Sequence, residues 1–225
     1  MKPTHKKILV LLIILVSPSV FYLFLKSARH NIQRLEIFGP KEVNEKGDSV
    51  YHTIPDFEFV NQYGKKISKK DFDGKIFVAD FIFTTCQSIC PKMSEQLTRV
   101  QEKIKEQDDV LLLSHTVDPE NDSVPVLLNY AQKMGAHEGK WHFVTGEKKT
   151  IYDIARYGYY VTALEGDGGP DDFIHSEKLM LIDKQGRIRG YYDGTADTSV
   201  KRLMDEIKVL KFEEQIPMKK NKNEK

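Results

Sequence analysis

The stretch Asp80-Phe81-Ile82-Phe83-Thr84-Thr85-Cys86-Gln87-Ser88-Ile89-Cys90-Pro91 holds both cysteines of this 225-residue chain. The residues before Cys86 form an apolar run typical of a buried strand, and apolar side chains recur at helical spacing after Cys90. A chain that uses cysteine nowhere else is not using it to fill its core. Two thiols placed where a strand gives way to a helix therefore predict redox chemistry or the binding of a soft metal ion.

Strand and helix patterns alternate on both sides of this stretch. Expected strands cover residues 57–60, 75–83, 110–117, 141–144, 179–183 and 187–192, and expected helices cover residues 91–106, 123–134, 147–156 and 196–210. This order predicts an α/β fold of the thioredoxin type, with a mixed sheet and helices on both of its faces. We expect the strand over residues 75–83 to be central, because its apolar run is nearly unbroken.

The N-terminal region contains 18 consecutive uncharged residues, 8–25. As a helix they extend about 27 Å, close to the thickness of a bilayer core. Lys2, Lys6 and Lys7 precede them, which favours a cytoplasmic N-terminus. A cleaved signal peptide is the alternative, but Lys26-Ser27-Ala28 fits a cleavage site poorly. We therefore expect one transmembrane anchor in the cytoplasmic membrane, with the rest of the chain on the extracytoplasmic, periplasmic side.

The chain is expected to have five parts. They are a cytoplasmic tip (1–7), the transmembrane anchor (8–25), a polar stalk (26–52), a thioredoxin-like domain (53–212) and a lysine-rich disordered tail (213–225).

The formal net charge of the chain is +1, which gives no reason to expect a nucleic-acid partner.

The cysteine pair has a spacing suited to two kinds of chemistry. If a helix begins at Cys86, both side chains lie on one face with their Cα atoms about 6 Å apart, within disulfide range. The positive end of the helix lowers the pKa of a cysteine there and favours the thiolate. Two thiolates are good ligands for Cu(I), and a nitrogen donor beside them allows Cu(II) to be held as well.

Seven histidines are available as that nitrogen donor. His175 directly precedes the late expected strand, and in a thioredoxin-type layout the segment entering this strand lies over the cysteine pair. From position alone His175 is either a ligand or a structural histidine. His115 ends a buried strand and is expected to be a hydrogen-bonded core residue.

These features together resemble the SCO/SenC family of copper-binding cytochrome c oxidase assembly factors, which have a thioredoxin fold. The resemblance extends over about residues 53–212. The motifs that carry it are the Cys86-x-x-x-Cys90-Pro91 pattern, Val117-Asp118-Pro119-Glu120-Asn121-Asp122 and His175-Ser176.

The resemblance implies a copper site and a partner. It implies that Cys86, Cys90 and His175 bind copper, as Cu(I) or Cu(II). It further implies a membrane-anchored chaperone, a carrier more than an enzyme, that receives copper from an upstream donor. The acceptor is then the CuA site on a subunit of cytochrome c oxidase.

The alternative function is that of a thiol–disulfide oxidoreductase, which reduces acceptor cysteines before they receive metal. It needs Cys86 and Cys90 and no third ligand. A peroxidase of the peroxiredoxin type is disfavoured, because Thr84 and Thr85 precede Cys86 without the expected proline. A purely structural disulfide is disfavoured as well, because it closes too small a loop to stabilise the domain appreciably.

The acidic residues after the third expected strand invite a catalytic interpretation, but a structural one fits better. Asp118 and Pro119 are expected to form a turn, and Asp122 or Ser123 to cap the following helix. Met93, one turn beyond Cys90, is expected to lie in the core.

Overall fold

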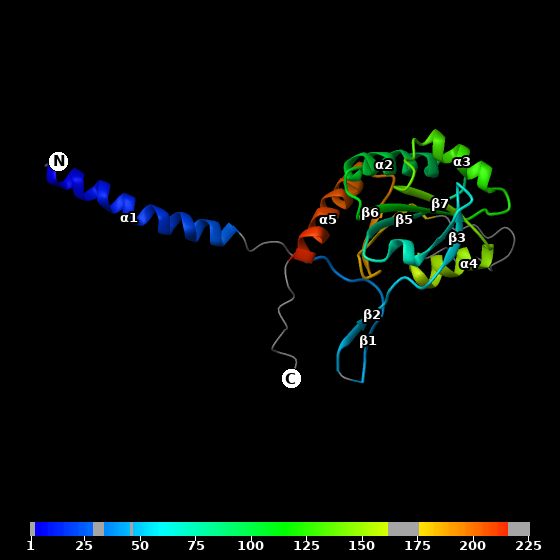
Figure 1. Ribbon diagram of the computed structural model, residues 1–225, viewed down its shortest axis with the longest axis horizontal. Helices are drawn as coiled ribbons and strands as arrows, with labels where there is room; N and C mark the ends of the chain where they lie inside the picture. Colours follow the sequence, from blue (N-terminus) through cyan, green and yellow to red (C-terminus); the bar gives the residue numbers. More distant parts are fainter. Residues whose placement is uncertain (1–2, 29–33, 46, 162–175, 216–225) are drawn as a thin grey trace. The chain divides into compact units, whose positions relative to one another are not determined.

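The computed structural model describes residues 3–28, 34–45, 47–161 and 176–215 (Figure 1). The chain divides into two compact units, Met1–Arg34 and Leu35–Lys225. The first unit contains helix α1 (Pro3–Ala28). No helix in the described ranges is both long enough and apolar enough to span a membrane. The anchor predicted over residues 8–25 is therefore not confirmed.

The second unit is built on a seven-stranded mixed sheet with the strand order β4-β3-β7-β6-β5-β8-β9. Strands β5, β6 and β7 run parallel to one another, and the remaining neighbours pair in antiparallel fashion. The strands are β3 (Glu58–Asn61), β4 (Lys66–Ser68), β5 (Ile76–Ile82), β6 (Val110–Thr116), β7 (Trp141–Thr145), β8 (Lys178–Ile182) and β9 (Ile188–Asp193). A separate two-stranded sheet pairs β1 (Lys41–Val43) with β2 (Ser49–Tyr51).

Helices cover both faces of the large sheet. Side chains from α2, α3 and α5 join one hydrophobic cluster, and side chains from α4 and η2 join the other. Figure 1 shows α2 and α3 on one side of the strands and α4 on the opposite side. The helical elements are η1 (Lys69–Phe72), α2 (Ile89–Ile104), α3 (Val124–Lys133), α4 (Lys148–Asp153), η2 (Ile154–Gly158) and α5 (Asp197–Gln215). The predicted mixed α/β fold with helices on both faces is confirmed.

Strand β5 lies inside the sheet between β6 and β8, and all seven of its residues are buried. Its side chains alternate between the two clusters: Val78 and Ile82 join one, and Phe77 and Phe81 join the other. A strand covered on both faces needs apolar residues at every position, which explains its unbroken apolar sequence. The polar exception, Asp80, belongs to the site described below.

The expected strands and helices are present with small shifts at their ends. Strand β4 and helix η1 were not predicted; β4 has three residues with one buried side chain, too few for a recognisable alternation. Strands β1 and β2 were not predicted either, and they lie within the range assigned to the stalk. The five-part division of the chain stays a prediction.

A buried arginine joins three parts of the second unit. Arg189, on β9, is 5% exposed. It donates to the backbone oxygens of Leu35 at 2.7 Å and Glu36 at 3.0 Å. It also forms ion pairs with Asp183, after β8, at 3.0 Å and with Glu213 of α5 at 2.7 Å. The beginning of the unit, the β8–β9 hairpin and the end of its last helix therefore depend on one guanidinium.

We expect Arg189→Met to lower the free energy of unfolding by about 3 kcal/mol, because the change removes the hydrogen bonds of a buried guanidinium and takes one of its two arginine partners from the buried Asp183. Urea denaturation followed by circular dichroism measures this loss. Arg99→Met is the matched control, because Arg99 forms an exposed ion pair with Asp197 and its loss should change the midpoint little. Equal midpoints for the two variants would contradict the role given to Arg189.

Candidate metal and redox site

The cysteines lie where the chain leaves β5 and enters α2. The backbone N–H of Cys86 donates to the oxygen of Phe83 at 3.2 Å, which closes a turn before the helix. Ser88 occupies the N-cap, so α2 begins at Ile89, two residues before the start predicted from the sequence, and Cys86 precedes the helix. Cys90 is the second residue of α2. Pro91 falls in the first turn, where its missing N–H costs no hydrogen bond.

The two cysteines nevertheless contact each other. The backbone N–H of Cys90 donates to the Sγ of Cys86 at 3.4 Å. The Oγ of Ser88 lies 3.8 Å from the same sulfur. Both cysteines are free thiols, with Cys86 9% exposed and Cys90 2% exposed. The turn therefore assembles a reduced pair in which Cys86 is the more accessible member.

The environment gives the two thiols opposite pKa shifts. Burial alone disfavours a thiolate at Cys86, but hydrogen bonds from the Cys90 backbone and from Ser88 outweigh it and lower the Cys86 pKa below its ordinary value. At Cys90 burial dominates and raises the pKa to about 12, helped by the neighbouring Cys86 and by the charge of Asp80. The pair therefore favours a thiolate at Cys86 and a protonated thiol at Cys90.

Asp80 is a buried acid that the sequence analysis did not single out. It lies on β5 with no exposed surface. The hydroxyl of Ser114 donates to its Oδ1 at 2.5 Å and in turn accepts from Trp141 Nε1 at 2.8 Å. Its Oδ2 has no hydrogen-bond partner among the described residues. Burial raises the pKa of Asp80 to about 7. The sequence feature that could have identified Asp80 is the presence of an acidic residue inside an otherwise apolar strand.

The third predicted ligand, His175, lies outside the described residues, so its position relative to the cysteines stays a prediction. Ser176, which follows it, is buried and accepts a hydrogen bond from the backbone N–H of Lys178 at 3.2 Å. Within the part of the chain that the structure describes, no group of three or more His, Cys, Asp or Glu residues is placed to hold a metal ion.

Two other expectations are confirmed. His115 is fully buried, its ring stacks on Phe81 with centroids 5.1 Å apart, and its Nε2 lies 3.3 Å from the hydroxyl of Tyr159. Burial lowers the His115 pKa to about 3, so this histidine stays neutral. Met93 has no exposed surface and belongs to the core cluster on the cysteine side of the sheet.

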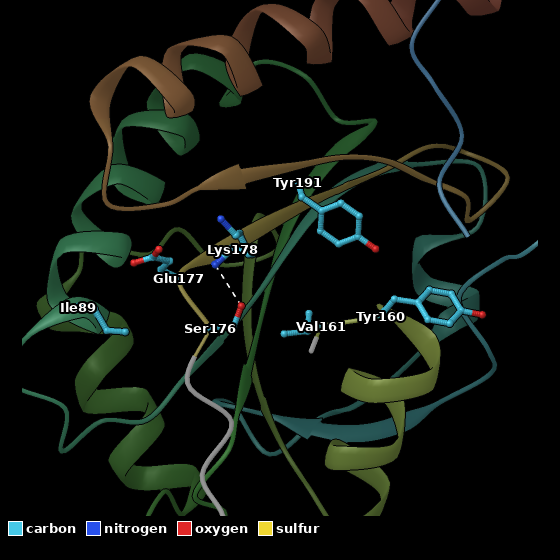
Figure 2. Close-up of a pocket in the computed structure, with 7 residues that line it drawn as sticks. All are labelled: Ile89, Tyr160, Val161, Ser176, Glu177, Lys178 and Tyr191. Carbon is cyan, nitrogen blue, oxygen red and sulfur yellow. Dashed lines mark hydrogen bonds between the residues drawn. The ribbon is translucent and has the colours of Figure 1, made fainter. Parts of the chain in front are cut away.

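A cavity of about 540 Å³ adjoins the cysteine turn (Figure 2). Ile89, the residue before Cys90, lines it from α2. Tyr160 and Val161 line it from the segment after η2. The remaining lining residues come from the segment that enters β8, from the first residue of β8 and from β9: Ser176, Glu177, Lys178 and Tyr191. The two ends of the described chain on either side of residues 162–175 therefore border the same cavity as the cysteine helix.

The acidic motif between β6 and α3 forms the expected turn. The backbone N–H groups of Asn121 and Asp122 donate to the oxygen of Asp118 at 3.2 and 2.8 Å. Ser123 occupies the N-cap of α3, which is one of the two positions expected, but its side chain forms no capping hydrogen bond. Asp122 directs its carboxylate away from the helix, toward hydroxyl and N–H donors near the cysteine turn.

These features define a thioredoxin-like domain that presents a reduced cysteine pair at the carboxyl end of an inner strand. The family model of SCO1/SenC matches residues 45–210. The chain belongs to the SCO1/SenC family.

Individual relatives agree with this assignment. The SCO1 protein homolog of Bacillus subtilis is 30% identical over 162 residues, covering 72% of this chain and 84% of the relative. The structure of BsSco, a member of the Sco family of cytochrome c oxidase assembly proteins described with a disulfide switch, is 29% identical with a TM-score of 0.63, covering 79% and 98%. ScoI of Arabidopsis thaliana, solved with copper bound, is 27% identical with a TM-score of 0.56, covering 72% and 98%.

Asp80 predicts a dependence of stability on pH. Its pKa of about 7 in the folded chain lies above the ordinary value, which is about 3.9. The folded chain therefore binds this proton more tightly, and the associated stability is lost as the pH rises from about 4 to about 7. We expect Asp80→Asn to be more stable than the wild type at pH 8, by up to a few kcal/mol, with the difference vanishing near pH 4.

Urea denaturation at several pH values tests this expectation. Asp183→Asn is the control, because Asp183 is buried but accepts hydrogen bonds from two arginines and from backbone N–H groups. That variant should be less stable than the wild type at pH 8. An Asp80→Asn variant that lost as much stability at pH 8 would show that Asp80 is charged and well solvated in the fold.

Proposed function

We propose that this chain binds copper through Cys86, Cys90 and His175 and delivers it to the CuA site of cytochrome c oxidase. The observation that carries the proposal is the reduced cysteine pair, in which one sulfur touches the backbone N–H of the other residue. The family assignment supports it, because BsSco belongs to a family of oxidase assembly proteins and the Arabidopsis relative was solved with copper bound.

The donor set suits a soft ion. Cys86 favours the thiolate, which is the form that binds metal. Cys90 keeps its proton in the free protein, so copper binding displaces that proton and becomes pH-dependent. Thiolates select Cu(I), and an imidazole extends the site to Cu(II). The proposal for His175 is supported by its peptide bond to Ser176, which lines the same cavity as Ile89, next to Cys90.

Transfer by ligand exchange follows from the unequal exposure of the two cysteines. Cys86 lies in the turn before the helix and is the more accessible sulfur. A thiolate of the acceptor attacks the copper ion from this side and replaces Cys86, which leaves as a stabilised thiolate. Cys90 is released next and recovers its proton. An upstream donor loads the site by the same exchange in reverse.

A second candidate function is thiol–disulfide exchange, and the opposite pKa shifts of the two cysteines favour it. Cys86 as a thiolate attacks a disulfide of the acceptor and forms a mixed disulfide, releasing one acceptor thiolate. Cys90 then loses its proton and attacks Cys86, which releases the second acceptor thiolate. The acceptor gains two electrons, and Cys86 and Cys90 become a disulfide. The disulfide switch described for BsSco supports this chemistry.

We also propose that residues 8–25 attach the chain to the cytoplasmic membrane, with the cysteines on the periplasmic side. The support is the absence of charge over these 18 residues in the sequence. Extraction of membranes at alkaline pH tests this: the full-length chain should stay in the membrane fraction. Release of the chain by alkaline buffer without detergent would contradict membrane anchoring.

Copper binding by the reduced full-length chain tests the main proposal. We expect one tightly bound copper ion, an affinity at least tenfold lower for His175→Ala, and no tight binding when Cys86 and Cys90 are both serine. Equilibrium competition with a chromophoric Cu(I) chelator measures the affinity. His137→Ala is the matched control, because His137 is exposed and lies beside Glu102. Absence of tight copper in the reduced wild type would contradict the proposal and leave thiol–disulfide exchange.

A further inference from the structure

Asp122 is a fully buried carboxylate between β6 and α3 that joins two distant parts of the chain. Its oxygens accept from the backbone N–H of Thr84 at 3.1 and 3.3 Å and from the hydroxyl of the same residue. The hydroxyl of Thr116, at the end of β6, donates to the second oxygen. Hydrogen bonds to a carboxylate are stronger than neutral ones, so this set of contacts fixes Thr84 against β6.

The peptide group between Phe83 and Thr84 transmits this contact to the first cysteine. The N–H of the group donates to Asp122. The carbonyl of the same group, on Phe83, accepts from the backbone N–H of Cys86 at 3.2 Å. Because a peptide group is planar, fixing the direction of its N–H also fixes the direction of its carbonyl. Asp122 therefore sets the turn that contains Cys86.

The second cysteine depends on the same turn. The backbone of Phe83 also forms a hydrogen bond to the side chain of Cys90. The backbone N–H of Cys90 reaches the sulfur of Cys86. Any movement of the segment from Phe83 to Thr84 thus changes a hydrogen bond at each cysteine.

We propose that Asp122 is a positioning residue for the cysteine pair, acting through the Phe83–Thr84 peptide to hold both sulfurs within reach of one metal ion or of each other. The part of this inference that concerns copper rests on the proposed function. The part that concerns the disulfide does not, because the reduction potential can be measured without metal.

Asp122→Asn tests the inference in the full-length chain. The amide replaces one acceptor oxygen with a donor, so it cannot accept from both the Thr84 and the Thr116 groups. We expect the Cu(I) affinity to fall at least tenfold in chelator competition. We also expect the disulfide to become about tenfold less favoured in the equilibrium with glutathione, because the sulfurs are no longer held within reach of each other; this corresponds to a potential about 30 mV less negative.

Two further variants separate positioning from a general loss of stability. Asp183→Asn is the matched control. Like Asp122, Asp183 is buried, and it accepts hydrogen bonds from the backbone N–H groups of Gln185 and Arg187. It follows β8, which runs antiparallel to β5, and so lies at the other end of the sheet from the cysteines. It should leave both measurements unchanged. Thr116→Val removes a single hydroxyl and should shift both in the same direction by a smaller factor, about threefold.

The outcomes for the two proposals are distinct. Wild-type affinity and potential in Asp122→Asn would overturn the positioning role, as would equal shifts in the Asp183→Asn control. If the Asp122→Asn chain fails to fold, an unshifted Thr116→Val would overturn it. A wild type without tight copper would contradict the proposed function alone, and the shift in potential would still decide the role of Asp122.

Discussion

The site depends on the end of one buried strand. Strand β5 is covered on both faces and must leave the sheet after Ile82, and α2 begins at Ile89. Parallel pairing with β6 places Ile82 beside Thr116, so the segment after β6 meets the cysteine turn. The short turn between β5 and α2 therefore has little freedom, and its hydrogen bonds decide where both sulfurs lie.

Hydrogen bonding at one cysteine and burial at the other give the two sulfurs their different chemistry. Cys86 receives hydrogen bonds that favour its thiolate, whereas Cys90 is more deeply buried and is also influenced by the charge of Asp80. Burying an acid without full hydrogen bonding costs stability. Such acids are found at functional sites, where they shift the pKa of a neighbouring group. Burial raises the pKa of both Asp80 and Cys90, and the charge of Asp80 adds a smaller upward shift at Cys90.

The strands and the helix around the site could be predicted from the sequence. The apolar runs of β5 and β6 and the helical spacing after Cys90 identified the strands and α2, because burial on both faces leaves a clear pattern. The predicted start of α2 lay two residues late, and the turn closed between Cys86 and Phe83 was not predicted, because such a turn has no signature in composition. The role of Asp122 could not be predicted from the sequence, because Asp122 and Thr84, which contact each other, are 38 positions apart.

The most direct test of the copper site is X-ray absorption spectroscopy of the copper-loaded, reduced chain. We expect two sulfur ligands at one copper ion together with one nitrogen ligand of imidazole character, and we expect the nitrogen ligand to disappear in His175→Ala. A spectrum with one sulfur ligand, or with oxygen and nitrogen ligands only, would contradict the claim that Cys86 and Cys90 bind the metal together.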